Sequence, residues 1–286
     1  MITSKTKAWL SSILALIIAV LCFVACSNEA DEGVKVPPSN TPQAQIITEL
    51  QEFNNSLVVM PESRKLKWYQ WISVALSDAC GAISGANAGK IGMIICAVNA
   101  SFSKYMEYLE KNDKLEAQTH NKIGLDSYGA AYAMCKDKVV PSDYTLGLSY
   151  NLDSCSINIG ILHNKIIDCI EDVALKNNLD IWLAKLPPNE KAILEDEKFK
   201  VLFNKISLTP PMRLDNTDTT PYAVMQLYLE AVEEQGQNEE TFKAINVKYI
   251  SKIQNSIEIS KKEKEIILSG ISVMIYSYDY WSERLQ

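Results

Sequence analysis

The pattern of apolar and polar positions along most of this chain has the period of an α-helix. Apolar side chains recur every three to four residues, whereas the strict alternation of a half-buried strand is nearly absent. The pattern predicts helices at residues 43–58, 62–88, 90–111, 158–184, 189–206, 221–235, 239–256 and 260–284. The predicted fold class is therefore all-α, an irregular bundle of several helices.

Capping signals support several of these helix ends. Thr41-Pro42 and Thr220-Pro221 each place a capping residue before a proline at the first helical position. Ser260 and Glu263 have the spacing of a capping box. Residues 113–156 have scattered glycine, serine and aspartate, and they predict a long irregular insert.

One predicted helix carries a strip of very small side chains. Ser73, Ser77, Gly81, Gly85 and Gly89 recur every four residues, so on a helix they share one face. Each glycine inside a helix costs about 1 kcal/mol relative to alanine, and close packing of a second helix can offset that cost. With a turn near residues 87–90, the strip predicts a buried, glycine-zipper-like hairpin.

Membrane insertion of the same hairpin, residues 72–103, is an alternative, because strips of small residues also associate helices in lipid. Asp78 and Lys90 interrupt the apolar run. The charge-free stretches 79–89 and 91–103 are shorter than the ~20 residues that a span requires. We therefore favour the buried hairpin and keep a membrane-active effector, pore-forming or bacteriocin-like, as the alternative.

Titratable residues give little sign of catalysis. The chain has two histidines, His120 and His163, too few for a zinc site built on several of them. On a helix His163 shares a face with isoleucines, so it should be buried and need a partner. Asp78, the one acid in the small-residue segment, is the candidate, and we expect a structural buried pair of Asp78 and His163. No Gly-x-Ser-x-Gly elbow is present, and the sequence predicts no catalytic residue, metal or cofactor.

The N-terminus has a different pattern. Lys5 and Lys7 precede an uncharged apolar run, residues 8–25, and the small residue Ala25 stands directly before Cys26. This arrangement resembles the signal peptides of bacterial lipoproteins, and the resemblance implies cleavage before Cys26 and lipidation of that cysteine. An uncleaved membrane helix is the alternative, because ~18 apolar residues can just span a bilayer.

The residues after Cys26 refine the expected location. Ser27, followed by an acidic cluster, resembles the surface lipoproteins of Bacteroidota and implies a lipid anchor in the outer membrane with exposure at the cell surface. The organisation that follows is a signal peptide at 1–25, a flexible proline-containing tether at 26–42 and a single helical domain at 43–286.

The net charge of the chain argues against nucleic acid as a partner. Loss of the two signal lysines leaves 26 basic and 35 acidic side chains, a net charge of −9, with no basic cluster to bind nucleic acid.

Five cysteines remain after Cys26: Cys80, Cys96, Cys135, Cys155 and Cys169. Their odd number and spacing favour small buried side chains, and whether any pair form a bridge stays open. Cys135–Cys155 is the favoured bridge if one exists.

The leading hypothesis is a non-enzymatic interaction or structural role at the cell envelope, with the outer membrane bound through the lipid and a protein or glycan partner left open. A glycan-binding surface lipoprotein is a further alternative. Tyr276 and Tyr280 share a helix face, and with Tyr69 or Tyr222 they could form a platform on which sugars stack. Packing of these aromatic rings in the bundle is the simpler expectation.

Overall fold

Helices account for nearly all of the chain that the structure describes, as the apolar periodicity predicts. The structure is a computed structural model and describes residues 42–57, 69–111, 125–170, 219–236 and 238–285. These residues form nine α-helices and two 3₁₀ turns, with no strand among them. The predicted all-α fold is confirmed. The signal peptide, residues 26–41 of the tether and the predicted helix 189–206 lie outside the described residues, while Pro42, the last residue assigned to the tether, begins α2.

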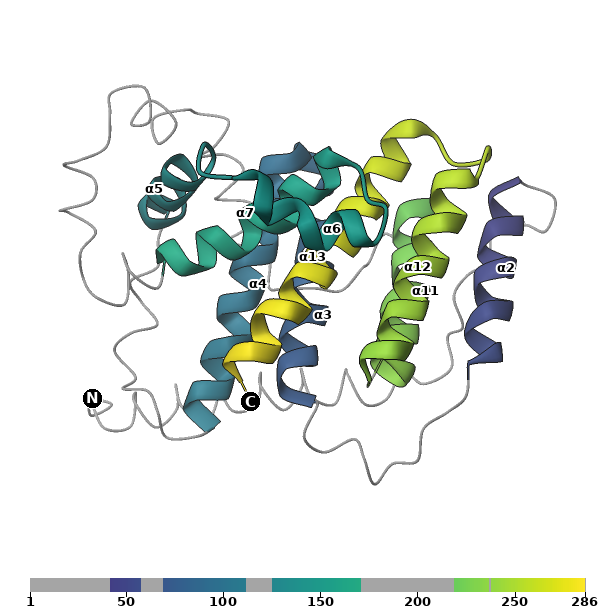
Figure 1. Ribbon diagram of the computed structural model, residues 1–286, viewed down its shortest axis with the longest axis horizontal. Helices are drawn as coiled ribbons and strands as arrows, with labels where there is room; N and C mark the ends of the chain where they lie inside the picture. Colours follow the sequence, from purple (N-terminus) through teal and green to yellow (C-terminus); the bar gives the residue numbers. More distant parts are fainter. Residues whose placement is uncertain (1–41, 58–68, 112–124, 171–218, 237, 286) are drawn as a thin grey trace, which may run out of the picture. The chain divides into compact units, whose positions relative to one another are not determined.

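The elements follow one another along the chain with short connections where both ends are described (Figure 1). The α-helices are α2 (Pro42–Ser56), α3 (Tyr69–Ser84), α4 (Gly89–Lys111), α5 (Leu125–Cys135), α6 (Thr145–Ser149), α7 (Ser154–Ile170), α11 (Thr220–Gln235), α12 (Glu239–Asn255) and α13 (Lys261–Arg284). The 3₁₀ turns are η2 (Ala86–Ala88) and η4 (Pro141–Tyr144).

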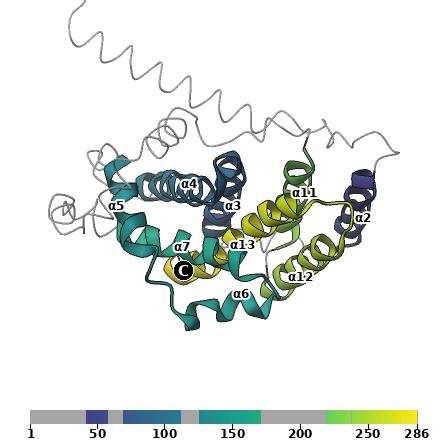
Figure 2. The same cartoon turned by 90° about the horizontal axis from the view of Figure 1, so that it is seen from above.

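Four of these helices pack against one another and surround the buried polar residues described below. The helices α3 and α4 form a hairpin, α7 packs on α4, and α13 packs on both α3 and α7 (Figure 2). The helices α11 and α12 contact α13 from another side, with α2 against α11, and α5 packs on α7. Helix α13 therefore contacts most of the other helices.

The central position of α13 explains why it is buried all round. Every residue from Ile267 to Tyr278 is buried, serines and Gly270 included. A helix with neighbours on all sides needs no polar face. Its start is the predicted capping box: the Ser260 hydroxyl accepts a hydrogen bond from the Glu263 N–H, and the Glu263 carboxylate accepts one from the Ser260 N–H.

The α3–α4 hairpin turns where the small residues predict it. Helix α3 ends at Ser84 and α4 begins at Gly89, and the segments Trp71–Ser84 and Ala86–Tyr105 are bent by 48° relative to each other. A Cβ atom on Gly81 would lie 2.5 Å from the Cys96 carbonyl oxygen, and one on Gly85 would overlap the Gly92 carbonyl. Both glycines therefore permit backbone contact between the helices.

The strip divides into three parts with different roles. Gly89 has a φ of 73° and open space around it, so it serves the turn rather than the packing. Ser73 and Ser77 are half-buried, while Gly81 and Gly85 lie where α3 and α4 approach each other most closely.

The predicted irregular insert consists, where described, of α5, η4 and α6 joined by turns. The sequence pattern missed α5, which has little amphipathic character: its residues include Gly129 and several alanines.

Candidate functional site

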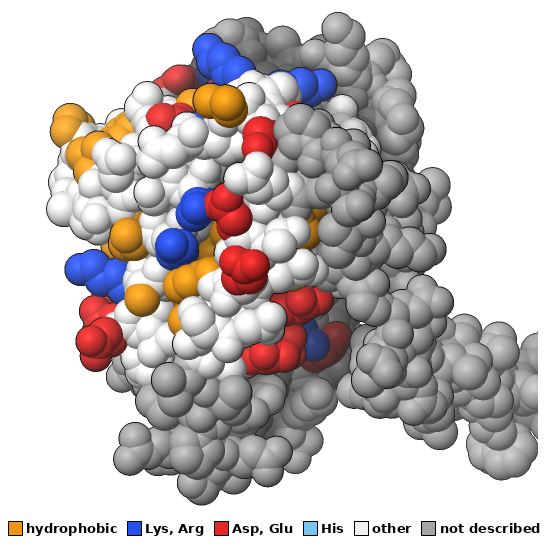
Figure 3. All heavy atoms as spheres, turned by 90° about the vertical axis from the view of Figure 1, so that its right-hand side faces the viewer, with side chains coloured by type: hydrophobic (Ala, Val, Ile, Leu, Met, Phe, Trp, Pro, Cys, Tyr) orange, Lys and Arg blue, Asp and Glu red, His pale blue; other side chains and the backbone are white. Residues whose placement is uncertain are grey.

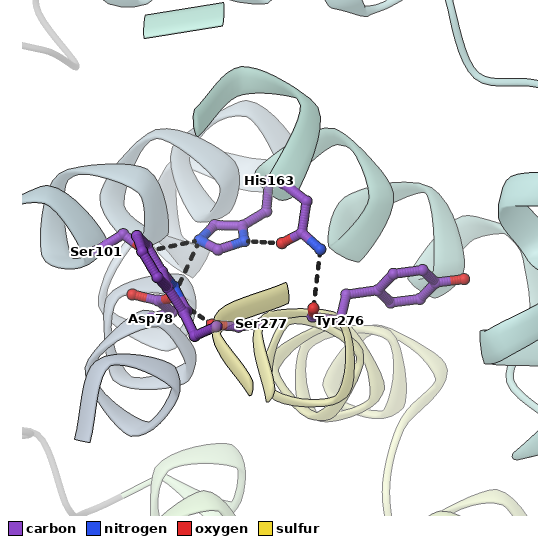
Figure 4. A network of polar contacts seen from close by, with 7 residues as sticks. Asp78, Ser101, His163, Tyr276 and Ser277 are labelled. Atoms are coloured by element: carbon purple, nitrogen blue, oxygen red, sulfur yellow. Dashed lines mark hydrogen bonds and ion pairs between the residues drawn. The ribbon is translucent and has the colours of Figure 1, made fainter. Parts of the chain in front are cut away.

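The main polar feature inside the bundle is a group of five side chains from four helices, which we call the buried polar cluster. It comprises Asp78 of α3, Ser101 of α4, His163 of α7, and Ser277 and Trp281 of α13 (Figure 4). Four of them are 0% exposed and Trp281 is 1% exposed. The cluster therefore lies where the four central helices meet.

The structure brings Asp78 and His163 together. Oδ2 of Asp78 lies 3.5 Å from Nε2 of His163. The same oxygen accepts hydrogen bonds from the Ser277 hydroxyl and from Nε1 of Trp281, the latter at 3.3 Å. The Ser101 hydroxyl lies 3.4 Å from Nε2 of His163. Nε2 thus faces a carboxyl and a hydroxyl together.

The neighbouring Asn164 sets the tautomer of His163. Its Nδ2 donates a hydrogen bond to the carbonyl oxygen of Tyr276 at 2.8 Å, which fixes the orientation of the amide (Figure 4). Oδ1 of Asn164 is then directed at Nδ1 of His163, 2.9 Å away, and can only accept. The hydrogen-bond network therefore assigns the proton of neutral His163 to Nδ1, with a lone pair on Nε2 facing Asp78 and Ser101.

Burial shifts the pKa values of the two residues in opposite directions. Desolvation raises the pKa of Asp78 from 3.8 to about 7, although donors on Ser101, Ser277 and Trp281 oppose the shift. Desolvation lowers the pKa of His163 from 6.5 to about 4, although hydrogen bonds to the Asn164 side chain and to the Ala97 backbone oppose the shift. At neutral pH His163 is therefore uncharged, and Asp78 lies near its titration midpoint. This is a desolvated polar contact rather than a buried ion pair.

The proton on Asp78 has a structural use. A protonated Oδ2 can donate toward the lone pair on Nε2, whereas an ionised carboxylate sets two acceptors against each other. Oδ1 of Asp78 accepts no hydrogen bond from the residues that the structure describes. Ionisation would leave that oxygen charged and buried without a donor, which is unfavourable.

The cluster has the residue types of a Ser–His–Asp triad but not its connectivity. In a triad the carboxylate accepts from Nδ1–H, and the nucleophilic hydroxyl lies at Nε2. Here Asp78 and Ser101 both face Nε2, and Asn164 occupies Nδ1. The Ser101 hydroxyl is also 0% exposed, so an ester or amide substrate has no access to it. The geometry supports packing and hydrogen bonding rather than acyl transfer.

Sequence reasoning missed three members of the cluster. Ser101, Ser277 and Trp281 come from segments far from Asp78 in sequence, and nothing in the local pattern marks them. One weak signal exists: Ser277 and Trp281 are four residues apart, so on one helix they share a face.

The predicted aromatic platform is not formed around Tyr276. That side chain is 6% exposed, its hydroxyl donates to the Asp143 carbonyl at 2.9 Å, and it accepts from the Gly147 N–H at 3.1 Å. The Tyr222 hydroxyl donates to the Ile83 carbonyl, and the Tyr280 hydroxyl donates to Asp168. The Tyr276 ring therefore packs inside and is not available to stack on a sugar.

The cysteines are placed differently from the favoured bridge. Sγ of Cys135 lies 2.8 Å from Sγ of Cys169. Cys155 instead interacts with the amine of Lys90. All five cysteines after Cys26 are reduced thiols in this structure, as the sequence favours. Cys169 rather than Cys155 lies beside Cys135, because α7 carries Cys155 at its start and Cys169 near its end. Cys26 lies outside the described residues.

The described surface offers no second site of comparable definition. On the face over α2 and α12, basic, acidic and small apolar patches are interspersed (Figure 3). A shallow hollow there is lined by Phe53, Glu240, Lys243, Ala244, Val247, Lys248 and Ser251. No group of three or more His, Cys, Asp or Glu side chains suited to a metal ion occurs among the described residues.

None of the described helices, taken singly, combines the length and apolar character that a membrane span requires. Trp71–Ser84 and Ala86–Tyr105 meet the requirements only as a bent pair. Much of this pair is interior, since Trp71, Ala79, Ile83, Ile94 and Val98 are all buried.

Comparison with protein families, with characterised proteins and with solved structures found no match to this chain.

Proposed function

We propose that this chain is a lipid-anchored protein of the bacterial outer membrane with a non-enzymatic role, either binding a partner or supporting envelope structure. The anchor rests on the sequence: a basic start, an apolar run, and Ala25 directly before Cys26. The non-enzymatic role rests on one observation, the closure of the buried polar cluster.

The cluster is the part of the described chain with the chemistry closest to catalysis. It has a hydroxyl, an imidazole and a carboxyl within about one hydrogen bond of each other, yet none is exposed. A general base must reach the proton it removes. Groups that bind one another in the interior of four packed helices stabilise a scaffold, and a scaffold suits a protein that displays a surface to partners.

Lipidation can be tested with a matched pair of cysteine variants. The full-length protein would be expressed in a Gram-negative host and labelled metabolically with an alkyne fatty acid. We expect label on the wild type and on Cys22→Ser, and none on Cys26→Ser. Unlabelled wild type, or label that Cys22→Ser abolishes, would overturn the proposed anchor.

The non-enzymatic role can be tested with a fluorophosphonate probe, which modifies activated serine hydroxyls. We expect the folded protein to stay unmodified at Ser101. Labelling that Ser101→Ala removes and Ser103→Ala retains would show an activated, accessible nucleophile and contradict the proposal. Ser103 is a suitable control because it lies on the same helix and is half-buried.

A membrane-active role is the second candidate, favoured by the joint length and composition of the bent α3–α4 pair. It requires the hairpin to leave the bundle. Asn87 is exposed at the hairpin turn, so Asn87→Glu should leave the core intact while opposing entry of the turn into lipid. Dye release from liposomes by wild type but not by Asn87→Glu would support this candidate over the first. Full dye retention by the wild type would exclude it.

A further inference from the structure

The end of α5 and the end of α7 meet through two cysteines. Cys135 is the last residue of α5 and is buried, while Cys169 lies one residue before the end of α7 and is half-buried. Their sulfur atoms are 2.8 Å apart. The Cys135 thiol also lies 3.3 Å from the carbonyl oxygen of Lys165, one turn before Cys169 on the same helix. The two side chains thus point at each other across a helix–helix contact.

The distance between the two sulfur atoms indicates whether the pair is suited to binding a zinc ion or to forming a disulfide. Two thiolates on a tetrahedral zinc ion are separated by about 3.8 Å, given zinc–sulfur bonds of ~2.3 Å. The observed 2.8 Å is shorter than that but longer than the ~2.0 Å of a covalent sulfur–sulfur bond, so the two cysteines are reduced thiols in direct contact, with no room for an ion between them. We propose that Cys135 and Cys169 are a disulfide-forming pair that closes under oxidising conditions and fastens α5 to α7.

The bond would form by thiol–disulfide exchange with a donor disulfide, either oxidised glutathione or an oxidised dithiol enzyme. The Cys169 thiolate attacks one donor sulfur, forming a mixed disulfide and releasing the first donor thiolate. The Cys135 thiolate then attacks the Cys169 sulfur and releases the second. Two cysteine thiols lose two protons and two electrons, and the donor disulfide is reduced to two thiols.

The surroundings favour Cys169 as the first nucleophile. Cys169 is half-buried and reachable from solvent, whereas the contact with Cys169 and burial together raise the pKa of the Cys135 thiol. Burial also raises the pKa values of Cys80 and Cys96 to about 12, so those thiols resist reaction. One bridge and three thiols would account for the odd number of cysteines after Cys26.

The bridge has a clear structural purpose. Among the described elements, α7 is the extensive neighbour of α5, so a covalent bond there would fix a helix that otherwise has limited support. The two cysteines are 34 residues apart in sequence, and closing a loop of that length restricts the unfolded chain. Formation in the cell rests on the proposed export, because disulfides persist in oxidising compartments.

The pairing can be tested without reference to location. The full-length protein would be purified in detergent, reduced, equilibrated with oxidised glutathione, alkylated and digested without reduction. We expect one cross-linked peptide pair containing Cys135 and Cys169, with Cys80, Cys96 and Cys155 alkylated. Alkylation of both Cys135 and Cys169, or a link from either to another cysteine, would overturn the proposal.

The unfolding temperature distinguishes a specific Cys135–Cys169 bond from nonspecific oxidation of other thiols. We expect oxidation to raise the unfolding temperature of wild type and of Cys155→Ser by roughly 5–10 °C, and to leave Cys169→Ser unchanged. An equal shift in Cys169→Ser would contradict the pairing. A further experiment would alkylate free thiols at the moment of cell lysis, so that the pair is trapped as it stands in the cell. Its redox state then shows whether the protein lies in an oxidising compartment. A pair that closes with glutathione but is open in cells would count against the proposed export and leave the pairing intact.

Discussion

Nε2 of His163 faces Oδ2 of Asp78 at 3.5 Å, and neither side chain has any solvent exposure. Such a contact is often an ion pair near the surface, but here burial opposes charge on both partners. The imidazole is held neutral by desolvation, and the carboxyl titrates near pH 7. The helices α3 and α7 are therefore joined by a contact whose strength depends on one proton.

The pH dependence of stability follows from these two shifts. The pKa of Asp78 is raised in the folded state, so its contribution is most favourable near pH 4 and is lost as the pH rises toward 7. The pKa of His163 is lowered, so its contribution is favourable above pH 6.5 and is lost as the pH falls toward 4. Between pH 4 and 6.5 the two slopes oppose each other and should largely cancel.

Asp78→Asn should remove one of the two opposing effects. The amide oxygen can still accept from Ser277 and Trp281, and no charge forms at high pH, but that oxygen cannot donate to Nε2 of His163 as the protonated carboxyl can. We expect the free energy of unfolding at pH 8 to exceed that of wild type, by up to roughly 4 kcal/mol, and at pH 4 to fall below it by about 1 kcal/mol, the value of the lost hydrogen bond. Urea unfolding at both pH values measures this. A variant less stable than wild type at pH 8 would mean that the carboxylate itself stabilises the fold.

Two serines on α13 provide a matched comparison. Ser277 donates to Asp78, while the Ser272 hydroxyl, equally buried, has no hydrogen-bond partner among the described residues. We expect Ser277→Ala to lower the free energy of unfolding by about 1–3 kcal/mol, more at pH 8 than at pH 5. Ser272→Ala should be neutral or stabilising. Equal losses in the two variants would refute a specific role for the Ser277 hydroxyl.

The close approach of α3 and α4 makes Gly81 sensitive to a single methyl group. The added Cβ would lie 2.5 Å from a backbone oxygen, and a backbone atom cannot rotate away. Gly81→Ala should cost about 1–3 kcal/mol of unfolding free energy, in spite of the better helix propensity of alanine. Asn87→Ala, at the exposed turn, should change it by less than about 0.5 kcal/mol. Thermal melts compare the two, and a stabilised Gly81→Ala would show that the helices can separate freely.

The Tyr276 hydroxyl links α13 to the segment of η4 and α6. It donates to the Asp143 carbonyl and accepts from the Gly147 N–H. Tyr276→Phe leaves both backbone groups without this partner, so we expect a loss of about 1–2 kcal/mol. Tyr280→Phe, whose hydroxyl bonds an exposed carboxylate, should lose less than about 0.5 kcal/mol. Similar losses in urea titrations of the two variants would contradict this difference.

The sequence predicted most helix positions because periodicity and capping are local properties. The start of α13 at Ser260 and Glu263 and the hairpin turn near residues 87–90 both agree with the structure. The structure also places Asp78 beside His163, a pairing that followed from burial of two polar groups in apolar surroundings.

The features that the sequence did not predict depend on how the helices are positioned along one another in the folded protein. Ser101, Ser277 and Trp281 join the cluster only because α4 and α13 pack at particular heights against α3. The same reason applies to Cys135: its neighbour is at the far end of α7, which loop length alone could not indicate. Helix α5 was missed because its short, alanine-rich sequence has no strong amphipathic period.

The protonation state of His163 tests most directly whether the buried polar cluster is closed and structural. The chain has only two histidines, so His120→Gln leaves one imidazole to follow by long-range ¹H–¹⁵N NMR across a pH series. We expect a neutral ring protonated on Nδ1 at pH 7 that stays neutral to about pH 5. A ring that is doubly protonated at pH 7, or that titrates near its ordinary pKa, would show a charged or solvent-accessible histidine and contradict a closed structural cluster.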